Sequence, residues 1–397
     1  MSGRIYVAQG EADVGWLDVA LSGGRASGSV FQYDAAYVAT PGAFPVSPDL
    51  PLSARPIPLP GLPGAVRDAA PDAWGRQLIR RRLRGRAMTD LDALLGVSDD
   101  GRMGALRFRR EPGGAFVQGG EPVPAVIALA DLRRAADAVE RGDEEAPVAV
   151  LLAAGSASLG GARPKALVRD GSRVFLAKFP SAADDHDVIR WEAVALELAR
   201  LGGVDVPTAR LVEVGSEAVL LLERFDRAAA ARVPYWSAET AVAAADGDYL
   251  DLADAIRDGE AVGIKGQLGQ LWRRVAFFVA VHNSDDHFRN HGFLRAGHGW
   301  TLAPAFDLNP DDVIGRARAT TICGADLPAH EPAALVELAG ELGLSRDAWQ
   351  RALSDVLAAV DQWEAVAARH GLEAQEITRF RPILAGSTRA RLAALTA

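Results

Sequence analysis

The segment VHNSDDHFRNHGF, residues 281–293, is the most densely polar stretch of the chain. It places three histidines, two aspartates and two asparagines within thirteen residues, directly after an apolar run. In that run the apolar side chains recur at helical spacing, which predicts one helix over residues 267–283. The sequence therefore predicts a buried helix that leads into a loop of reactive side chains. The chemistry of this loop decides how the whole chain is interpreted.

The three histidines of this segment suggest a zinc site. His282, His287 and His291 are spaced five and four residues apart, and the last two could share a helical face. However, the HExxH pattern of zinc hydrolases is absent, and Gly292 follows His291 directly. A metal hydrolase is therefore the weaker interpretation. His287 is better explained as a hydrogen-bonded histidine that stabilises the loop.

Phosphoryl transfer explains the polar segment better. It needs a carboxylate that orients the attacking hydroxyl, oxygen ligands for Mg²⁺ and a lysine on the phosphates. Asp285 and Asn290 have the Asp-x-x-x-x-Asn spacing, and Asp307 follows a short predicted hairpin. Lys178 lies on a predicted strand after a glycine-rich loop, although a lysine there, considered alone, is more often a solvated residue at a sheet edge. The order of all these elements along the chain indicates a kinase.

The region before the polar segment is predicted to be a small sheet with one inserted helix, over residues 151–226. Strand patterns at 165–169 and 173–179 flank an Asp-Gly dipeptide, which is the strongest short hairpin signal. Apolar spacing predicts a helix over 187–201. Beyond this region the pattern becomes helical, and residues 331–397 are predicted to be helices.

The N-terminal part has a different character. Residues 4–8 and 14–20 read as strands, and the proline-rich segment 41–64 is predicted to be an ordered loop or a sheet edge. A Pro-Asp pair at 71–72 predicts the start of a helix. This helix continues into six arginines within residues 76–86, which form either a solvated helix face or a phosphate-contacting surface.

The composition limits the class of protein. A chain of 397 residues suggests two or three domains, and 49% hydrophobic residues indicate a globular protein. The net charge of −9 argues against a protein that coats nucleic acid or anionic membrane. The single cysteine, Cys323, excludes an intrachain disulfide and a multi-cysteine zinc site. Because the chain has neither a signal pattern nor a long apolar run, we expect a soluble cytoplasmic protein.

Several segments resemble the signatures of the HipA-like serine/threonine kinases, the toxin components of bacterial type II toxin–antitoxin systems. They are SLGGARPKA, FLAKFP, LLERFDR, NSDDHFRNH and LAPAFDL, and the resemblance extends over most of the chain. It implies an α+β, two-lobed protein-kinase-like fold with an added N-terminal subdomain and a helical C-terminal lobe. The implied boundaries are 1–110 for the N-terminal subdomain, 111–226 for the kinase N-lobe and 227–397 for the helical C-lobe.

The resemblance also implies a function. Kinases of this family use ATP and Mg²⁺, phosphorylate protein targets that include aminoacyl-tRNA synthetases, and phosphorylate themselves on a serine of the glycine-rich loop. A small helix-turn-helix antitoxin, HipB-like, holds them inactive, and contact with DNA is made indirectly through that antitoxin. No membrane partner is implied.

Matching the family motifs to this sequence assigns individual residues. Asp285 matches the catalytic base, Asn290 and Asp307 match the Mg²⁺ ligands, and Lys178 matches the lysine on the ATP phosphates. The remaining matches are Gly160, Gly161, Ala162, Arg163 and Lys165 in the glycine-rich loop, Ser158 or its neighbour Ser156 as the autophosphorylated serine, and Leu222, Glu223 and Phe225 in the adenine-binding hinge.

Three details depart from this pattern or leave it open. Pro164 removes one backbone N–H from any phosphate-binding loop. Asp286 directly follows Asp285, so the catalytic base could be misassigned by one residue, although only Asp285 has the four-residue gap to Asn290. Glu192 either pairs with the ATP-binding lysine or lies on a solvated helix face.

Two other functions remain open at this point. A small-molecule kinase on a related fold would use Asp285 to deprotonate the hydroxyl of a sugar or an antibiotic. An inactive corepressor that acts with an antitoxin would not need the matched residues. The presence of the predicted lysine, both Mg²⁺ ligands and the predicted base favours an active kinase.

Overall fold

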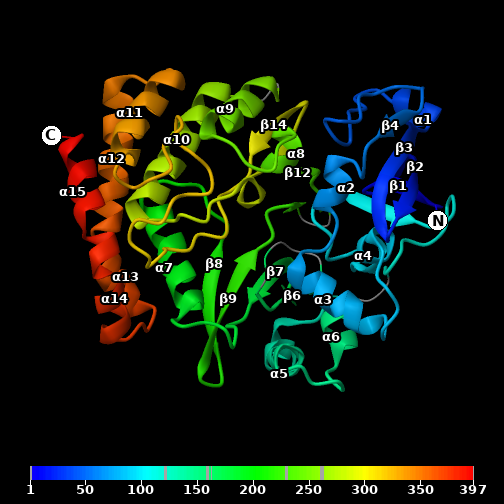
Figure 1. Cartoon of the computed structure of the whole chain (residues 1–397), viewed down its shortest axis with the longest axis horizontal. Helices are drawn as coiled ribbons and strands as arrows, with labels where there is room; N and C mark the ends of the chain where they lie inside the picture. The colour runs from blue at the N-terminus through cyan, green and yellow to red at the C-terminus, as the bar shows by residue number, and fades with distance from the viewer. Residues whose placement is uncertain are drawn as a thin grey trace. The chain divides into compact units, whose positions relative to one another are not determined.

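The computed structural model describes residues 2–119, 123–157, 161, 163–228, 231–259 and 263–396 (Figure 1). The chain divides into two compact units. The first comprises residues 1–182 and 214–236, and the second comprises residues 183–213 and 237–397. Within the described residues, no helix combines the length and apolar character needed to cross a membrane.

The first unit begins with an antiparallel sheet of five strands in the order β4-β3-β2-β1-β5. Its strands alternate between buried and more exposed side chains, as a sheet with one covered face requires. Leu17, Val19 and Phe31 point into the core of this sheet and are fully buried. These first five strands are β1 (Ser2–Gln9), β2 (Ala12–Ser22), β3 (Arg25–Tyr33), β4 (Ile57–Leu59) and β5 (Leu106–Arg109).

The proline-rich segment contributes the edge strand β4, which is one of the two alternatives that the sequence left open. Pro58 pairs with Val30 at the edge of the sheet, where a residue without a backbone N–H is tolerated. The predicted helix after the Pro-Asp pair is also confirmed, because the Asp72 carboxylate accepts a hydrogen bond from Gly75 N at 2.6 Å and caps α3. The helices of this unit are α1 (Ala35–Val38), α2 (Gly64–Asp68), α3 (Ala73–Arg82), α4 (Asp90–Gly96), α5 (Leu129–Glu140) and α6 (Val148–Ala153), with a 3-10 turn at Val126–Ala128.

A second sheet of the first unit is built around a central strand, β7. The predicted Asp-Gly hairpin is confirmed: Gly171 adopts a φ of 61°, and Asp170 faces Arg173 across the turn. On its other side β7 pairs with β9, which runs through buried apolar residues. The remaining strands of this unit are β6 (Lys165–Asp170), β7 (Arg173–Lys178), β9 (Glu217–Glu223), β10 (Arg227–Ala228) and β11 (Ala231–Arg232), while β8 (Ala209–Val214) and β12 (Tyr235–Ser237) fall at the unit boundaries.

The second unit is mainly helical and is organised around α10. Leu271, Trp272 and Val275 of this helix are at most 1% exposed, and α12 packs against both α10 and α7. The helix predicted over residues 267–283 therefore exists, but it begins at Ile264 and ends at Val281. The helices of this unit are α7 (Val188–Leu201), α8 (Ala238–Val242), α9 (Tyr249–Asp258), α10 (Ile264–Val281), α11 (Glu331–Glu341), α12 (Arg346–Val360), α13 (Trp363–Arg369), α14 (Ala374–Leu384) and α15 (Ser387–Ala394).

The predicted hairpin after the polar segment is present as β13 (Gly292–Ala296) and β14 (Gly299–Leu302), which are antiparallel. The polar segment thus lies between the buried end of α10 and the start of this hairpin. The C-terminal region is helical, as predicted, and forms α11 to α15, coloured orange to red in Figure 1.

Candidate active site

The polar loop begins where α10 is terminated by a left-handed residue. His282 adopts a φ of 55° at the C-cap, and the next backbone N–H, that of Asn283, donates to Phe278 O at 2.9 Å. The His282 ring donates from Nε2 to Val313 O at 3.0 Å. This histidine therefore ends the helix and holds the loop, which assigns it a structural task.

The two adjacent aspartates of the loop have opposite surroundings. The side chain of Asp285 is exposed, whereas that of Asp286 is 1% exposed. A group that must reach a substrate needs solvent access, and a buried carboxylate needs partners in the protein. The exposure pattern therefore agrees with Asp285 as the reactive residue of the pair.

Asp286 is held by three hydrogen-bonding partners. Its Oδ2 accepts from the Tyr249 hydroxyl and lies 2.7 Å from His291 Nε2, and its backbone carbonyl accepts from Thr320 Oγ1 at 2.5 Å. Burial by itself raises the pKa of Asp286, but the interactions with His291 and Tyr249 and the charge of Arg318 outweigh it, so the pKa lies below its usual value. Asp286 is therefore an ionised anchor beneath the loop.

This anchor continues into a buried network that sequence patterns did not reveal. Arg318 donates from Nη1 to the Tyr249 hydroxyl at 3.2 Å and from Nε to Glu331 Oε1 at 2.6 Å. Arg318 and Glu331 are each about 1% exposed at their side chains. Arg274 of α10 lies 3.4 Å from His291 Nδ1 and donates to Ala303 O at 2.6 Å. The only sequence signal was His291, five residues after Asp286.

Asn290 is tied directly to the backbone of the proposed base. Its Nδ2 donates to Asp285 O at 3.1 Å, and its backbone N–H donates to His287 O at 2.8 Å. The intervening residues form a 3-10 turn, Phe288–Asn290. Because the amide nitrogen is used within the loop, the amide oxygen is the atom left to coordinate a cation, and the spacing of the Asp-x-x-x-x-Asn motif is explained by this turn.

Asp307 lies close enough to Asp285 to change its ionisation. Partial desolvation raises the pKa of Asp285 above its usual value, and the charges of Asp307 and Asp286 raise it further, against the opposing charge of His287. Asp307 itself adopts a φ of 60°, a left-handed conformation that is uncommon for residues with a side chain and is often found at functional sites.

The segment after Asp307 is bound to the polar loop by further hydrogen bonds. Asn309 N donates to Asn283 Oδ1 at 3.2 Å, and the Ser284 hydroxyl donates to the Asp311 carboxylate. Asp311 N in turn donates to His282 O at 3.0 Å. The second unit therefore brings the predicted base and both predicted Mg²⁺ ligands together in one hydrogen-bonded substructure.

The first unit holds the predicted ATP lysine, hinge and glycine-rich loop, whereas Glu192 on α7 belongs to the second unit. Lys178 is the last residue of β7, faces Lys165 on one side and Leu220 on the other, and is 7% exposed. The alternative of a solvated residue at a sheet edge is therefore wrong, because β7 is flanked on both sides by paired strands. Glu192 is 2% exposed on α7, so the alternative of a solvated helix face is wrong for this residue as well.

The glycine-rich loop is described only in part, since Ser158, Gly160 and Ala162 lie outside the described residues. Gly161 adopts a φ of 103°, which favours glycine, and its carbonyl accepts from Lys165 Nζ at 3.1 Å. The same Nζ lies 2.7 Å from Asp72 Oδ2 in a buried ion pair. Lys165 therefore anchors the loop to the start of α3, while Arg163 is half-exposed.

Ser156, the second predicted phosphorylation site, is completely buried, and its hydroxyl donates to Lys165 O. In the predicted hinge, Leu222 is 5% exposed and Glu223 faces Phe175 across the sheet. The ring of Phe225 packs 6.3 Å from that of Tyr235, centroid to centroid.

The zinc interpretation of the polar segment finds no support in these positions. His282 and His291 are engaged in separate hydrogen bonds, as described above. Across the part of the chain that the structure describes, the single group with metal-ligand spacing is Asp185, His186 and Asp312. Arg379 binds both of these aspartates, donating at 2.6 Å to each, so the positive charge of an arginine already balances that group.

Two family models match the chain. The model of the HipA-like C-terminal domain matches residues 157–363, and that of the HipA N-terminal domain matches residues 5–109. The first alone covers more than half of the chain. A comparison with curated protein sequences found no match.

The same fold is found in a solved structure of a HipA protein. HipA from a complex of the Shewanella oneidensis MR-1 toxin–antitoxin proteins HipA and HipB with their operator DNA has a TM-score of 0.67 at 16% identity, covering 99% of this chain and 96% of that one. The Helicobacter pylori proinflammatory kinase CtkA has a TM-score of 0.45 at 15% identity, covering 60% and 93%. The expected fold class, an N-terminal sheet subdomain with a kinase-like fold and a helical C-terminal region, is confirmed. The chain belongs to the HipA-like family, a family of serine/threonine protein kinases.

Proposed function

We propose that this protein is an ATP- and Mg²⁺-dependent serine/threonine protein kinase that acts as a growth-inhibiting toxin. The observation that carries the proposal is the loop at Asp285, an exposed carboxylate on a backbone that Asn290 holds by a hydrogen bond. Family membership supports the use of ATP. The chemistry of each side chain supports a distinct task for it.

Asp285 is proposed to orient the substrate hydroxyl and to accept its proton. A carboxylate whose pKa is raised above its usual value is a stronger base than an ordinary one. Asp286 cannot take this task, because its carboxylate is buried and bound by His291 and Tyr249. These opposite environments support the register in which Asp285 is the base.

Asn290 and Asp307 fit a magnesium site by the chemistry of their donors. Mg²⁺ takes oxygen ligands, and it is commonly bound by one or two protein side chains together with phosphate and water. Asn290 offers its amide oxygen, since its amide nitrogen is occupied by Asp285 O, and Asp307 offers a carboxylate. When bound, the ion would neutralise charge on the ATP phosphates.

The first unit is proposed to bind the nucleotide. Lys178 would pair with the phosphates, and the backbone at Leu222, Glu223 and Phe225 would receive the adenine. The antiparallel pairing of β7 with β9 supports this assignment, because it places Lys178 and the hinge residues Leu222 and Glu223 in one sheet.

Autophosphorylation is proposed to occur on Ser158. Ser156 is the poorer acceptor, since its hydroxyl is buried and donates to Lys165 O. After incubation with Mg-ATP, mass spectrometry should find phosphate on Ser158. The added charge of about −1.5 to −2 would repel the ATP phosphates and slow the enzyme. Ser158→Ala should abolish the modification and Ser156→Ala should keep it. Phosphate on Ser156 alone would contradict the assignment.

The biological partners are proposed from the family and from the Shewanella complex. A helix-turn-helix antitoxin of the HipB type would bind this chain, and DNA would be contacted through the antitoxin. The target would be a cytoplasmic translation component such as an aminoacyl-tRNA synthetase. A small helix-turn-helix protein encoded beside this one would support the toxin assignment.

The function is tested by incubating the purified protein with labelled ATP, Mg²⁺ and a bacterial lysate. We expect transfer of the terminal phosphate to serine or threonine of protein bands. ATP consumption with label only on small hydroxyl compounds would instead indicate a small-molecule kinase. Absence of both ATP binding and phosphate transfer would indicate an inactive corepressor and overturn the proposal.

A further inference from the structure

The segment that follows β9 is held by an unusual concentration of charge. Arg224 N donates to Val174 O at 2.9 Å and so extends the pairing of β9 with β7. The chain then turns at Asp226, whose carbonyl accepts from Val233 N at 3.0 Å. This turn lies directly beyond Phe225, the last residue of the predicted hinge, and its conformation therefore sets where the hinge backbone ends.

Asp226 is the centre of this turn. It is completely buried, and its carboxylate accepts from Gly104 N at 2.7 Å, Arg224 Nε at 2.6 Å and Arg227 Nη1 at 2.8 Å. Burial alone would raise the pKa of Asp226, but the two guanidinium groups and the backbone N–H lower it to about 2. The carboxylate is therefore ionised and fully partnered.

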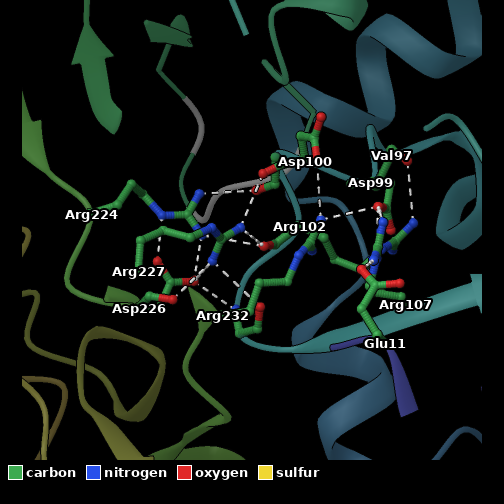
Figure 2. Close-up of polar contacts among 12 residues, drawn as sticks. Glu11, Val97, Asp99, Asp100, Arg102, Arg107, Arg224, Asp226, Arg227 and Arg232 are labelled. Atoms are coloured by element: carbon green, nitrogen blue, oxygen red, sulfur yellow. Dashed lines mark hydrogen bonds and ion pairs between the residues drawn. The ribbon is translucent and has the colours of Figure 1, made fainter. Parts of the chain in front are cut away.

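The two arginines carry this connection across to the N-terminal subdomain. Arg224 Nη1 donates to Gly101 O at 3.0 Å, and Arg227 Nη2 donates to Asp100 O at 3.0 Å and to Arg102 O at 2.8 Å. Figure 2 shows both side chains converging on Asp226 and on the loop that contains Asp100 and Arg102. Segments more than a hundred residues apart in the sequence are thus joined at the end of the hinge.

The far end of the network anchors that loop. Asp99 is completely buried and accepts from Arg107 Nη2 at 2.6 Å and Arg232 Nη2 at 3.0 Å (Figure 2). Arg102 is also completely buried and donates to Ala69 O at 2.7 Å. Burial lowers the pKa of Arg102 to about 9 against the opposing charge of Asp99, and its guanidinium also donates to the carbonyls of Leu94 and Val97.

Stability alone does not explain such a network of buried charges. Buried ion pairs often stabilise a fold no better than well-packed apolar residues would, because the charges lose their hydration. Their geometry, however, is specific, and a backbone bound at several points has little freedom to move. The loop at residues 99–104 therefore defines the position of the chain just beyond the hinge.

We propose that Asp226 is a positioning residue for the nucleotide, through which the N-terminal subdomain fixes the hinge backbone at Glu223 to Phe225. The inference rests on the proposed function, since it assumes that this hinge receives adenine. It assigns the N-terminal subdomain an indirect part in nucleotide binding, through the position of the hinge backbone.

The test compares two carboxylates that bind arginines at opposite ends of β9. Asp226→Asn removes the charge that Arg224 and Arg227 contact beyond the hinge, whereas Glu217→Gln removes the charge that Arg133 contacts at the start of the strand. KM and kcat for Mg-ATP and Mg-GTP are measured with purified full-length protein. For Asp226→Asn we expect KM for ATP to rise roughly 10- to 100-fold with kcat changed little, by analogy with the cost of small misplacements in active sites. The preference for ATP over GTP should fall as well.

Glu217→Gln should keep KM for ATP and the ATP preference within about twofold of wild type, because its bonds to Arg133 lie outside this network. Equal nucleotide parameters in the two variants, or a loss of kcat alone, would overturn the proposal. If Asp226→Asn fails to fold, the charge-balanced Asp226→Asn/Arg227→Gln variant replaces it, with the same expectation. A wild-type protein that does not bind Mg-ATP would instead refute the proposed function.

Discussion

At the residue scale, the adjacent carboxylates Asp285 and Asp286 show how one short sequence supports two tasks. Asp285 is exposed and has a raised pKa, whereas Asp286 is buried and has a lowered pKa. Neighbouring groups of the same type acquire different roles when their environments move their pKa values apart. Asp285, the proposed base, can therefore meet a substrate while its neighbour holds the loop.

Asp286→Asn should therefore destabilise the protein. The substitution removes a buried charge from His291 and Tyr249 but keeps a hydrogen-bonding side chain, so we expect a loss of about 1–3 kcal/mol at neutral pH. The pKa of Asp286 is lowered in the folded state. Its carboxylate therefore stabilises the fold at pH values above the unfolded-state pKa of about 3.9, and this stabilisation is lost as pH falls through the folded-state pKa.

Urea denaturation at neutral pH and at about pH 3 measures this difference. The difference in the free energy of unfolding between wild type and Asp286→Asn should be largest at neutral pH and should become smaller in acid. A variant as stable as wild type at neutral pH would show that Asp286 does not anchor the loop.

The residues of this site differ in how far the sequence could reveal them. The spacing of Asp285 and Asn290 could be recognised in the sequence because a single 3-10 turn determines it. Tyr249, Arg318 and Glu331 were not, since they come from separate segments that only the folded chain brings to Asp286.

At the scale of single elements, β7 carries the lysine predicted to bind ATP. Its hairpin with β6 was predictable from the Asp-Gly turn, but its central position in the sheet was not, because pairing with β9 joins residues more than forty positions apart. The end of α10 was similarly beyond sequence patterns. His282, left-handed at the C-cap, bonds to Val313, which lies 31 residues further along the chain.

The burial of Lys178 decides which variant tests it. Lys178→Met keeps an apolar stem of similar length in a site that is 7% exposed and removes only the charge. We expect a folded protein with weakened Mg-ATP binding, measured by titration calorimetry, and circular dichroism should match wild type. Lys265→Met, a change of the same type on the exposed start of α10, is the matched control. Unchanged ATP binding by Lys178→Met would refute its assignment.

At the scale of the whole molecule, the chain combines a sheet subdomain, a second sheet and a helical unit, each of which the sequence outlined by its own periodicity. The interactions that join distant segments could not be predicted from the sequence, and the Asp226 network is the clearest case. Its partners are separated by more than a hundred residues, and each would be read singly as a surface charge.

A nucleotide that binds only the folded protein should stabilise the whole chain. Mg-ATP at 100 times its dissociation constant should add about 2.7 kcal/mol to the free energy of unfolding. Thermal denaturation should therefore show a higher midpoint with Mg-ATP than with buffer. Adding EDTA in excess to the Mg-ATP sample, which removes the Mg²⁺, should reduce the shift. No shift at saturating Mg-ATP would count against a nucleotide site.

The most direct test of the account is phosphate transfer to protein by Asp285→Asn and Asp286→Asn, measured side by side below the melting temperature of both. Asp285→Asn should fold, bind Mg-ATP and lose transfer by roughly 10²- to 10⁴-fold, the usual contribution of a positioned general base. Its stability should equal or exceed that of wild type, because ionisation of a group with a raised pKa opposes folding at neutral pH.

Asp286→Asn should be less stable but should retain transfer while it is folded. An inactive Asp286→Asn beside an active Asp285→Asn would place the base one residue later. Wild-type transfer rates in both folded variants would contradict the assignment of this loop as the catalytic loop of a kinase.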